Sequence, residues 1–150
     1  MTSFNTEVFL FGGIIQFQNK EIYLDDFWSF NTITSLWKKI SPNGQIPSTR
    51  SGNSLNSKDY KLYIFGGKNN TIRFNDIYEF DTNKNTFIKI ESITNHPIPR
   101  TNHTAEIIDN SLIIFGGWDG TKTLNDMYEY SISIYIFIYR YKYILSYQLS

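Results

Sequence analysis

The 150-residue chain contains no cysteine. This absence excludes disulfide bridges, cysteine-ligated zinc or iron–sulfur sites, and thiol nucleophiles. It agrees with a reducing compartment, and we predict a cytoplasmic location. The chain also lacks an excess of either charge, because 14 Lys and Arg residues balance 14 Asp and Glu residues. The basic residues are scattered, so we expect no nucleic-acid partner.

Long apolar segments are missing as well. The N-terminal residues 1–11 lack the basic region and the extended apolar core of a signal peptide. Near the C-terminus, Arg140 and Lys142 interrupt the apolar run well before the ~20 residues that a spanning helix needs. We therefore expect no membrane partner. The hydrophobic content of 41% is instead enough for a globular core.

What the chain does contain is a repeat. Three apolar segments end in Phe-Gly-Gly, and they begin at Val8, Leu62 and Leu112, which are 54 and 50 residues apart. A period near 50 residues is the length of one four-stranded propeller blade. Four consecutive apolar residues before each glycine pair are typical of a strand that is buried on both faces. The repeat therefore predicts a stack of sheets.

Other features recur in step with the glycine pairs. An alternating segment that predicts a strand follows each pair, at residues 26–30, 76–80 and 126–130. Seven residues after each of these segments stands another aromatic residue, which marks the next strand: Trp37, Phe87 and Phe137. Proline and then arginine precede the second and third glycine pairs, in residues 47–50 and 97–100.

This order of features resembles the kelch family over about residues 7–140. The resemblance implies an all-β fold, a partial kelch β-propeller of about three four-stranded antiparallel blades. The blades would occupy about residues 7–42, 50–92 and 101–140, with an Ile/Tyr-rich tail at 141–150. The repeats resemble the kelch runs of Rab-effector and leucine-zipper-like regulator proteins.

The pattern breaks at both ends. Only residues 1–6 precede the first glycine-pair strand, so we expect the first blade to lack its innermost strand. After Tyr130 the polar turn is replaced by Ile/Tyr alternation, which makes the last strand degenerate. Residues 131–150 are either a closing strand pair or a mis-spliced end. Three blades cannot close a ring, and the open ends favour self-association.

Several repeated residues have structural explanations. Glycine pairs allow positive φ and a close approach of neighbouring backbone. Trp37 and Phe87 are expected to fill space between sheets, and Asp76 and Asp126 to cap loop amides. The glycine pairs are Gly12 and Gly13, Gly66 and Gly67, and Gly116 and Gly117.

Candidate binding residues lie in the loops after the glycine pairs, at 14–24, 68–74 and 118–124, and at the start of each inner strand. Variable loops on a rigid scaffold are common binding sites. Trp118 is either a lid on its own blade or an exposed anchor. The arginines and His103 either bond carbonyls or acids of adjacent blades or offer charge to an acidic peptide. The candidates are Arg50, Asn69, Arg73, Arg100, His103, Trp118 and Asp119.

The resemblance implies a protein–protein interaction module, as in kelch substrate receptors of ubiquitin ligases, effectors of Rab-type GTPases and cytoskeletal scaffolds. We predict no enzyme, metal or cofactor, because His96 and His103 lack a nucleophile or ligand cluster nearby in sequence. Kelch copper-radical oxidases need a cysteine, which this chain lacks. The alternatives are a truncated fragment of a longer kelch protein and a small-molecule or enzymatic propeller.

Overall fold

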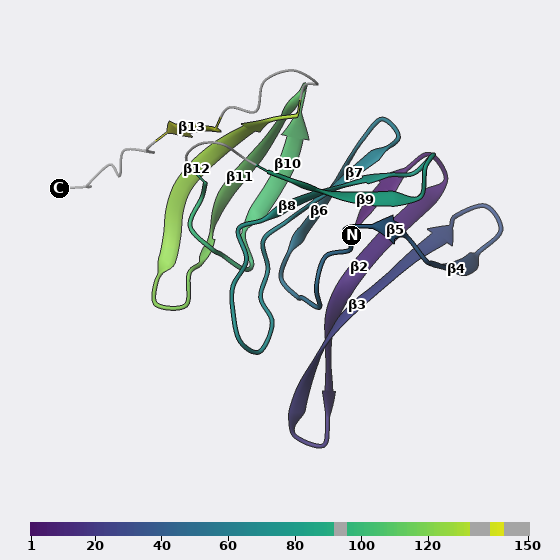
Figure 1. The fold of residues 1–150 in the computed structure, drawn as a ribbon, viewed down its shortest axis with the longest axis horizontal. Coiled ribbons are helices and arrows are strands. Elements are labelled where there is room, and N and C mark those ends of the chain that lie inside the picture. Colours follow the sequence, from purple (N-terminus) through teal and green to yellow (C-terminus); the bar gives the residue numbers. More distant parts are fainter. Residues whose placement is uncertain (92–95, 133–138, 143–150) are drawn as a thin grey trace.

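The computed structural model describes residues 1–91, 96–132 and 139–142. In these residues all regular structure is β, and it forms three sheets that lie side by side (Figure 1). The expected all-β fold with a series of antiparallel sheets is confirmed. Among the described residues, no helix is long and apolar enough to cross a membrane.

Each sheet is built from antiparallel hairpins in chain order. Sheet 1 consists of β1 (Thr2–Phe4), β2 (Glu7–Phe17), β3 (Lys20–Asn31) and β4 (Leu36–Ile40). The four antiparallel strands of sheet 2 are β6 (Ser54–Lys58), β7 (Lys61–Phe65), β8 (Ile77–Asp81) and β9 (Thr86–Ile90). Sheet 3 consists of β10 (Thr104–Ile108), β11 (Ser111–Trp118), β12 (Thr123–Ser131) and β13 (Tyr139–Lys142).

The innermost strands β1, β6 and β10 are neighbours, with β6 in contact with both of the others. The expectation that the first blade lacks its innermost strand is wrong, because residues 2–4 pair with residues 7–9 of β2. Asn5 turns the chain between them with a φ of 53°. Sheet 1 therefore begins at Thr2 rather than at residue 7. The polar residues of this short strand hid it from the hydrophobic pattern.

At the other end, β13 pairs with β12 and supplies the fourth strand of sheet 3. Tyr139–Lys142 overlaps the start of the segment 141–150 that was assigned to the tail. The strand expected around Phe137 lies outside the described residues. The stretch 143–150 lies outside them too.

The segment after the first glycine pair is not a loop. β2 and β3 run on as a paired hairpin to Phe17 and Lys20, and this hairpin projects from the body of the molecule (Figure 1). Gln18 and Asn19 form its turn, with φ values of 46° and 61°. Successive positive φ values suit the tight turns of β-hairpins, which asparagine tolerates well. The loop expected at 14–24 is therefore mostly strand.

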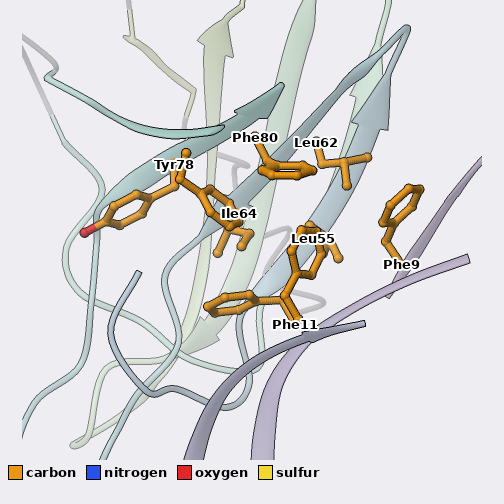
Figure 2. Packing of buried hydrophobic residues seen from close by; sticks show 9 residues of the cluster. Phe9, Phe11, Leu55, Leu62, Ile64, Tyr78 and Phe80 are labelled. Atoms are coloured by element: carbon orange, nitrogen blue, oxygen red, sulfur yellow. The ribbon is translucent and has the colours of Figure 1, made fainter. Parts of the chain in front are cut away.

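The hydrophobic core lies between sheets. Phe9 and Phe11 of sheet 1 pack against buried apolar residues of sheet 2, including Leu62 and Ile64 (Figure 2). Phe27 of sheet 1 belongs to the same cluster. A second cluster joins sheet 2 to sheet 3, and it consists of Phe65, Ile77, Leu112, Ile114, Tyr128 and Tyr130. The two clusters use the same repeat positions, so a single packing scheme is used twice.

Phe87 and Trp37 occupy equivalent positions but different environments. Phe87 is fully buried and lies 5.9 Å from Phe11 and 5.5 Å from Phe27, ring centre to ring centre. Trp37 is 57% exposed and contacts Phe30 of its own sheet. Within the described chain Trp37 does not fill space between sheets as expected, because its side of sheet 1 faces no other described sheet.

The crossover between sheets 1 and 2 is itself paired. The short strand β5 (Asn43–Gly44) runs parallel to β9, so sheet 2 gains a fifth strand. The Gln45 side chain also accepts a hydrogen bond from the Lys89 backbone amide at 2.8 Å. A segment that follows sheet 1 thus completes the outer edge of sheet 2, which ties the two sheets together.

Candidate functional site

The glycine pairs lie at one edge of the sheets, which we call the glycine rim, where the chain enters the next sheet. The backbone amide of Gly13 donates to the Arg50 carbonyl at 2.8 Å, and that of Gly67 to the Arg100 carbonyl at 2.9 Å. Each bond joins a glycine pair to the segment that leads into the following sheet. The second glycine of the first and second pairs therefore fixes the spacing between consecutive sheets at this edge.

The same two arginines anchor the rim from inside. Arg50 is fully buried, and its Nη1 donates to Asp76 Oδ1 at 2.7 Å and to the Gly66 carbonyl at 3.0 Å. Its Nη2 donates to Asp76 Oδ2 at 3.2 Å, so the pair is bidentate. The guanidinium also lies 4.0 Å from the centre of the Phe74 ring. Charge-assisted bidentate bonds of this kind hold both partners in one geometry.

Arg100 repeats this arrangement with Asp126, at 2.6 and 2.9 Å, and with the Gly116 carbonyl at 2.9 Å. Each arginine thus binds an acid and a carbonyl of its own sheet, not of an adjacent blade. Asp76 and Asp126 accept from buried guanidinium groups, whereas capping of loop amides was expected. We leave both arginines out of the proposed binding surface because neither side chain reaches solvent.

Sheet 1 carries the aspartate without the arginine. Asp26 stands at the repeat position of Asp76, and its Oδ2 accepts a hydrogen bond from Trp28 Nε1 at 2.7 Å. No ion pair to Asp26 occurs within the described residues. Sheet 1 can therefore be compared with sheets 2 and 3 to measure how much the buried arginine–aspartate pair stabilises a sheet.

Asn69 and Asp119 shape the rim loops. The Asn69 side-chain oxygen accepts from the amides of Thr71 and Ile72, each at 2.9 Å. Asp119 accepts in the same way from the amides of Thr121 and Lys122, at 2.7 and 2.8 Å. Hydrogen bonds from Lys122 and then Thr121 lower the pKa of Asp119 to about 2. Both side chains are thus engaged in turns of the same form.

Trp118 and Arg73 lie on the loops that these turns shape. Trp118 is 38% exposed, and its backbone exchanges hydrogen bonds with Thr101 at 2.9 and 3.1 Å. Arg73 reaches from the preceding loop to Gly120, where a Cβ atom would stand 2.5 Å from Nη1. The two loops therefore meet through this arginine. Its Nε is buried and has no hydrogen-bond partner within the described residues.

Two lysines complete this surface. Lys68 Nζ lies 5.7 Å from the centre of the Tyr23 ring, and Lys122 is exposed. A hollow of about 530 Å³ adjoins the last loop, lined by Ile98, Lys122, Thr123, Leu124, Asn125, Asp126 and Tyr128. We call Lys68, Arg73, Trp118 and Lys122 the rim surface. It combines one aromatic side chain with three cations.

His103 lies apart from the rim surface, beside the inner strands. Its Nε2 is 3.1 Å from Ser54 Oγ, and its ring packs edge-on against Phe65 at 5.0 Å. Burial, and secondarily the charge of Arg100, lowers the pKa of His103 to about 4. The hollow that it lines holds about 410 Å³ and is bounded by Met1, Thr2, residues 53–57 and residues 103–106. His103 is therefore a neutral packing residue at pH 7.

A pH dependence of stability follows from His103. Its pKa is lower in the folded chain than the ordinary 6.5, so only the unfolded chain takes up the proton between about pH 6.5 and 4. The free energy of unfolding is expected to fall on acidification through this range, by on the order of 2 kcal/mol from pH 7 to pH 5.

Urea unfolding at both pH values measures this loss. A His103→Gln variant keeps a hydrogen-bond partner for Ser54 but has no imidazole to titrate. Between pH 7 and pH 5, its free energy of unfolding should therefore decrease by about 2 kcal/mol less than that of the unaltered chain. An equal fall in both proteins would contradict the assignment.

Some residues of the rim were not found from the sequence. Phe74, which lies under Arg50, and Tyr23, which lies under Lys68, are both buried. The sequence pattern that could have indicated them is an aromatic residue shortly before the repeated aspartate, at two positions for Phe74 and three for Tyr23. Lys68 and Trp118 occupy the same repeat position, directly after a glycine pair, so alignment of the repeats could have joined Lys68 to the candidates.

Comparison with known proteins agrees with these repeats. The family model for the KLHDC2/KLHL20/DRC7 Kelch-repeats domain matches residues 1–136. The chain is similar to human Kelch domain-containing protein 1, at 32% identity over 40% of this chain and 15% of that protein. It is also similar to human Kelch domain-containing protein 3, at 34% identity over 43% of this chain and 16% of that protein.

A third relative carries an enzyme name. It is the N-(sulfonatooxy)prop-2-enimidothioate sulfolyase of Thlaspi arvense, at 33% identity over 45% of this chain and 19% of that protein. The chain thus spans between 15% and 19% of the length of these curated relatives.

Proposed function

The chain belongs to the kelch-repeat family, and on this basis we propose that it is a protein–protein interaction module that binds its partner through the rim surface. Kelch repeats place loops at the edge of a rigid stack of sheets, and the sequences of these loops differ from repeat to repeat. Function belongs to such sites rather than to the fold itself. The proposal therefore rests on the residues of the rim loops.

The observation that carries the proposal is Trp118. It is a large aromatic residue, 38% exposed, on a loop whose backbone is bonded on both sides to Thr101. A rigidly held tryptophan loses little conformational entropy on binding, and tryptophan is enriched among the residues that dominate interface energies. The adjoining hollow of about 530 Å³ has the size of a site for a peptide side chain or a short segment.

The charges of the rim surface indicate the chemistry of the partner. Lys68, Arg73 and Lys122 contribute three cations, whereas the nearby Asp119 carboxylate is occupied by its own turn. Arg73 is partly exposed, whereas its Nε is buried, so a docked segment would meet the accessible part of the side chain rather than Nε. We propose an acidic protein segment, which would offer carboxylates to Arg73 and an apolar side chain to Trp118.

Changing Arg73 and Trp118 to alanine together is expected to abolish partner capture. Truncating residues of this type at an interface centre costs about 2 kcal/mol or more each, so retention should fall by more than about tenfold. Quantitative affinity capture from an extract, with the chain as bait, measures this. Circular dichroism verifies that the variant keeps its fold.

The matched control removes one apolar and one cationic residue from the opposite edge. Ile33 is 77% exposed, and the Lys84 side chain is 79% exposed, in the β3–β4 and β8–β9 turns respectively. The double variant Ile33→Ala, Lys84→Ala should retain the same proteins as the unaltered chain. Equal retention by the rim variant would refute the rim as the binding surface.

The sulfolyase relative raises an enzymatic alternative. That activity belongs to the protein that bears the name, which this chain matches over 19% of its length. Within the described ranges, no three His, Asp or Glu side chains gather in a group that could hold a metal ion. We favour binding over catalysis because the exposed Trp118 on a rigidly held loop supports an interaction surface. A cytoplasmic location, and a role in ubiquitin ligation, Rab-dependent traffic or the cytoskeleton, stay predictions.

Self-association is part of the proposal. Sheets 1 and 3 each have one face that no other described sheet covers, and a further sheet packed there would extend the stack towards a ring. Such completion would hold the rim loops of neighbouring sheets in register.

A further inference from the structure

One face of sheet 1 has the composition of a core but is exposed. Leu10, Trp28, Phe30 and Trp37 lie on this face, which we call the open face. Leu10 is 38% exposed and Trp37 57% exposed. Their counterparts on sheet 2, at the same repeat positions, are Ile64, Tyr78, Phe80 and Phe87. All four counterparts are buried in the first core cluster.

The equivalent faces of sheets 2 and 3 are covered within the chain, and the residues that cover them can be named. On sheet 2 it is covered by Phe11 and Phe27 of sheet 1. On sheet 3 the equivalent face is covered by Phe65 and Ile77, which are the same two repeat positions on sheet 2. The contact between sheets 1 and 2 and the contact between sheets 2 and 3, which we call the two junctions, are therefore built alike. In each junction, two residues of one sheet pack on the next sheet: the aromatic residue before the glycine pair and the residue after the repeated aspartate.

Sheet 3 presents these two positions, and no other described sheet receives them. They are Phe115, which is 41% exposed, and Met127, which is partly exposed. Together with Ile113 on the same strand face as Phe115, they form what we call the far face. Every chain thus carries a receiving surface at one end and the matching inserting surface at the other.

The receiving surface continues along the projecting hairpin. Ile15 pairs with Ile22 across the hairpin, and both are exposed, as is Phe17. These residues share the hairpin face opposite Tyr23, whose ring is turned towards Lys68 of the next sheet. The apolar surface on the side of the open face therefore extends beyond the sheet. Contiguous apolar patches of this kind mark interaction sites.

Resting on the self-association included in the proposed function, we propose that the open face of sheet 1 binds the far face of sheet 3 of a second copy, reciprocally, so that two copies of the 150-residue chain form one closed ring. The pairing of the two faces repeats the two junctions inside the chain. Charged side chains also lie on these faces, because Asp26 and Lys39 contact Trp28 on the open face, and Glu106 and Glu129 pair with Ile113 on the far face. The contact is head-to-tail, and such contacts close into rings when the rotation allows. Two chains bring six sheets, within the roughly four to eight of known propellers.

Analytical ultracentrifugation of the full chain tests this proposal. The unaltered chain is expected to sediment with twice its 17.6 kDa mass. Trp37→Glu places a charge in the open face, and Phe115→Glu places one in the far face. Each variant alone should sediment as a 17.6 kDa monomer at concentrations where the unaltered chain is dimeric.

Mixing the two variants separates a head-to-tail contact from a face-to-face one. Trp37→Glu keeps an intact far face and Phe115→Glu an intact open face, so the mixture should recover a two-chain species through one junction. An Ile33→Glu control changes an exposed turn residue that lies on neither face, and it should stay dimeric. Circular dichroism confirms that each variant is folded.

Four results would overturn the proposal. They are a monomeric unaltered chain, loss of the dimer in only one of the two variants, no recovery on mixing, and masses that keep rising with concentration. The last would mean that the junction forms an open polymer rather than a ring. None of them bears on the rim surface, which the capture experiment tests separately.

Discussion

Asp126→Ala is expected to lower the free energy of unfolding by about 3–5 kcal/mol, because it leaves the buried Arg100 guanidinium without its counter-ion. Arg100 has no exposed surface on which to regain water. A loss of this size is a large fraction of the 5–15 kcal/mol that typically stabilises a domain. Urea unfolding followed by tryptophan fluorescence measures it.

The repeat supplies a matched control for this prediction. Asp26→Ala removes the same residue from sheet 1, where the carboxylate accepts only a hydrogen bond from Trp28 among the described side chains. Its expected cost is about 1 kcal/mol, the usual net value of one hydrogen bond. Equal losses in the two variants would contradict the role assigned to the arginine–aspartate pair.

Gly12→Ala is the second change with a large expected effect. Gly12 has a φ of 65°, and a Cβ atom there would stand 2.5 Å from the Arg50 carbonyl oxygen and 3.1 Å from that of Leu24. The left-handed conformation costs about 1–2 kcal/mol for a residue with a Cβ, and the clash with rigid backbone adds about 1–3 kcal/mol. We therefore expect a loss of about 2–5 kcal/mol.

Gly116→Ala separates the two contributions. Gly116 has nearly the same φ, 63°, and the same 3.1 Å approach to a leucine carbonyl, that of Leu124, but no arginine carbonyl lies near it. The difference between the two variants therefore isolates the junction between sheets 1 and 2. Thermal or urea unfolding of both should show the larger loss for Gly12→Ala. Indistinguishable losses would mean that strain in φ, rather than the junction, explains the glycine.

The repeats could be read from the sequence because they combine signals of different kinds. Phe-Gly-Gly, the alternating aromatic strand and the spaced Phe87 recur in the same order, and each has a local physical cause. The arginine–aspartate pairs were visible too, since Arg50 and Asp76 are separated by the same number of residues as Arg100 and Asp126. The short polar side chain next to a strand start indicates loop capping by itself, whereas the shared separation of 26 residues indicates a repeated pair.

Other features could not be read locally. Trp37 and Phe87 have equivalent positions, and only the neighbouring sheet decides that one is buried and the other exposed. The strand of residues 2–4 is too short and polar for a hydrophobic pattern. The turn of the hairpin after the first glycine pair contains no glycine. Gln18 and Asn19 adopt the positive φ values there, so the usual glycine signal of a hairpin turn is missing from the sequence.

The candidate binding residues also differ in whether their role could be predicted from the sequence. Arg50 and Arg100 have the residue type of a binding site, but the fold places them inside. Asn69 and Asp119 are on the predicted loops, where their side chains hold turns. Arg73 and Trp118 keep groups that a partner could reach, and this distinction depends on three-dimensional contacts. The rim surface is thus a small part of the predicted set, supported by residues that the sequence did not mark.

The central claim is that the sheets are stabilised by repeated junctions, within the chain and between two copies of it. Urea unfolding at several protein concentrations tests this claim most directly. The account predicts one cooperative transition whose midpoint rises with protein concentration, because dissociation and unfolding are coupled. A gradual loss of structure, or a midpoint that is independent of concentration, would contradict it.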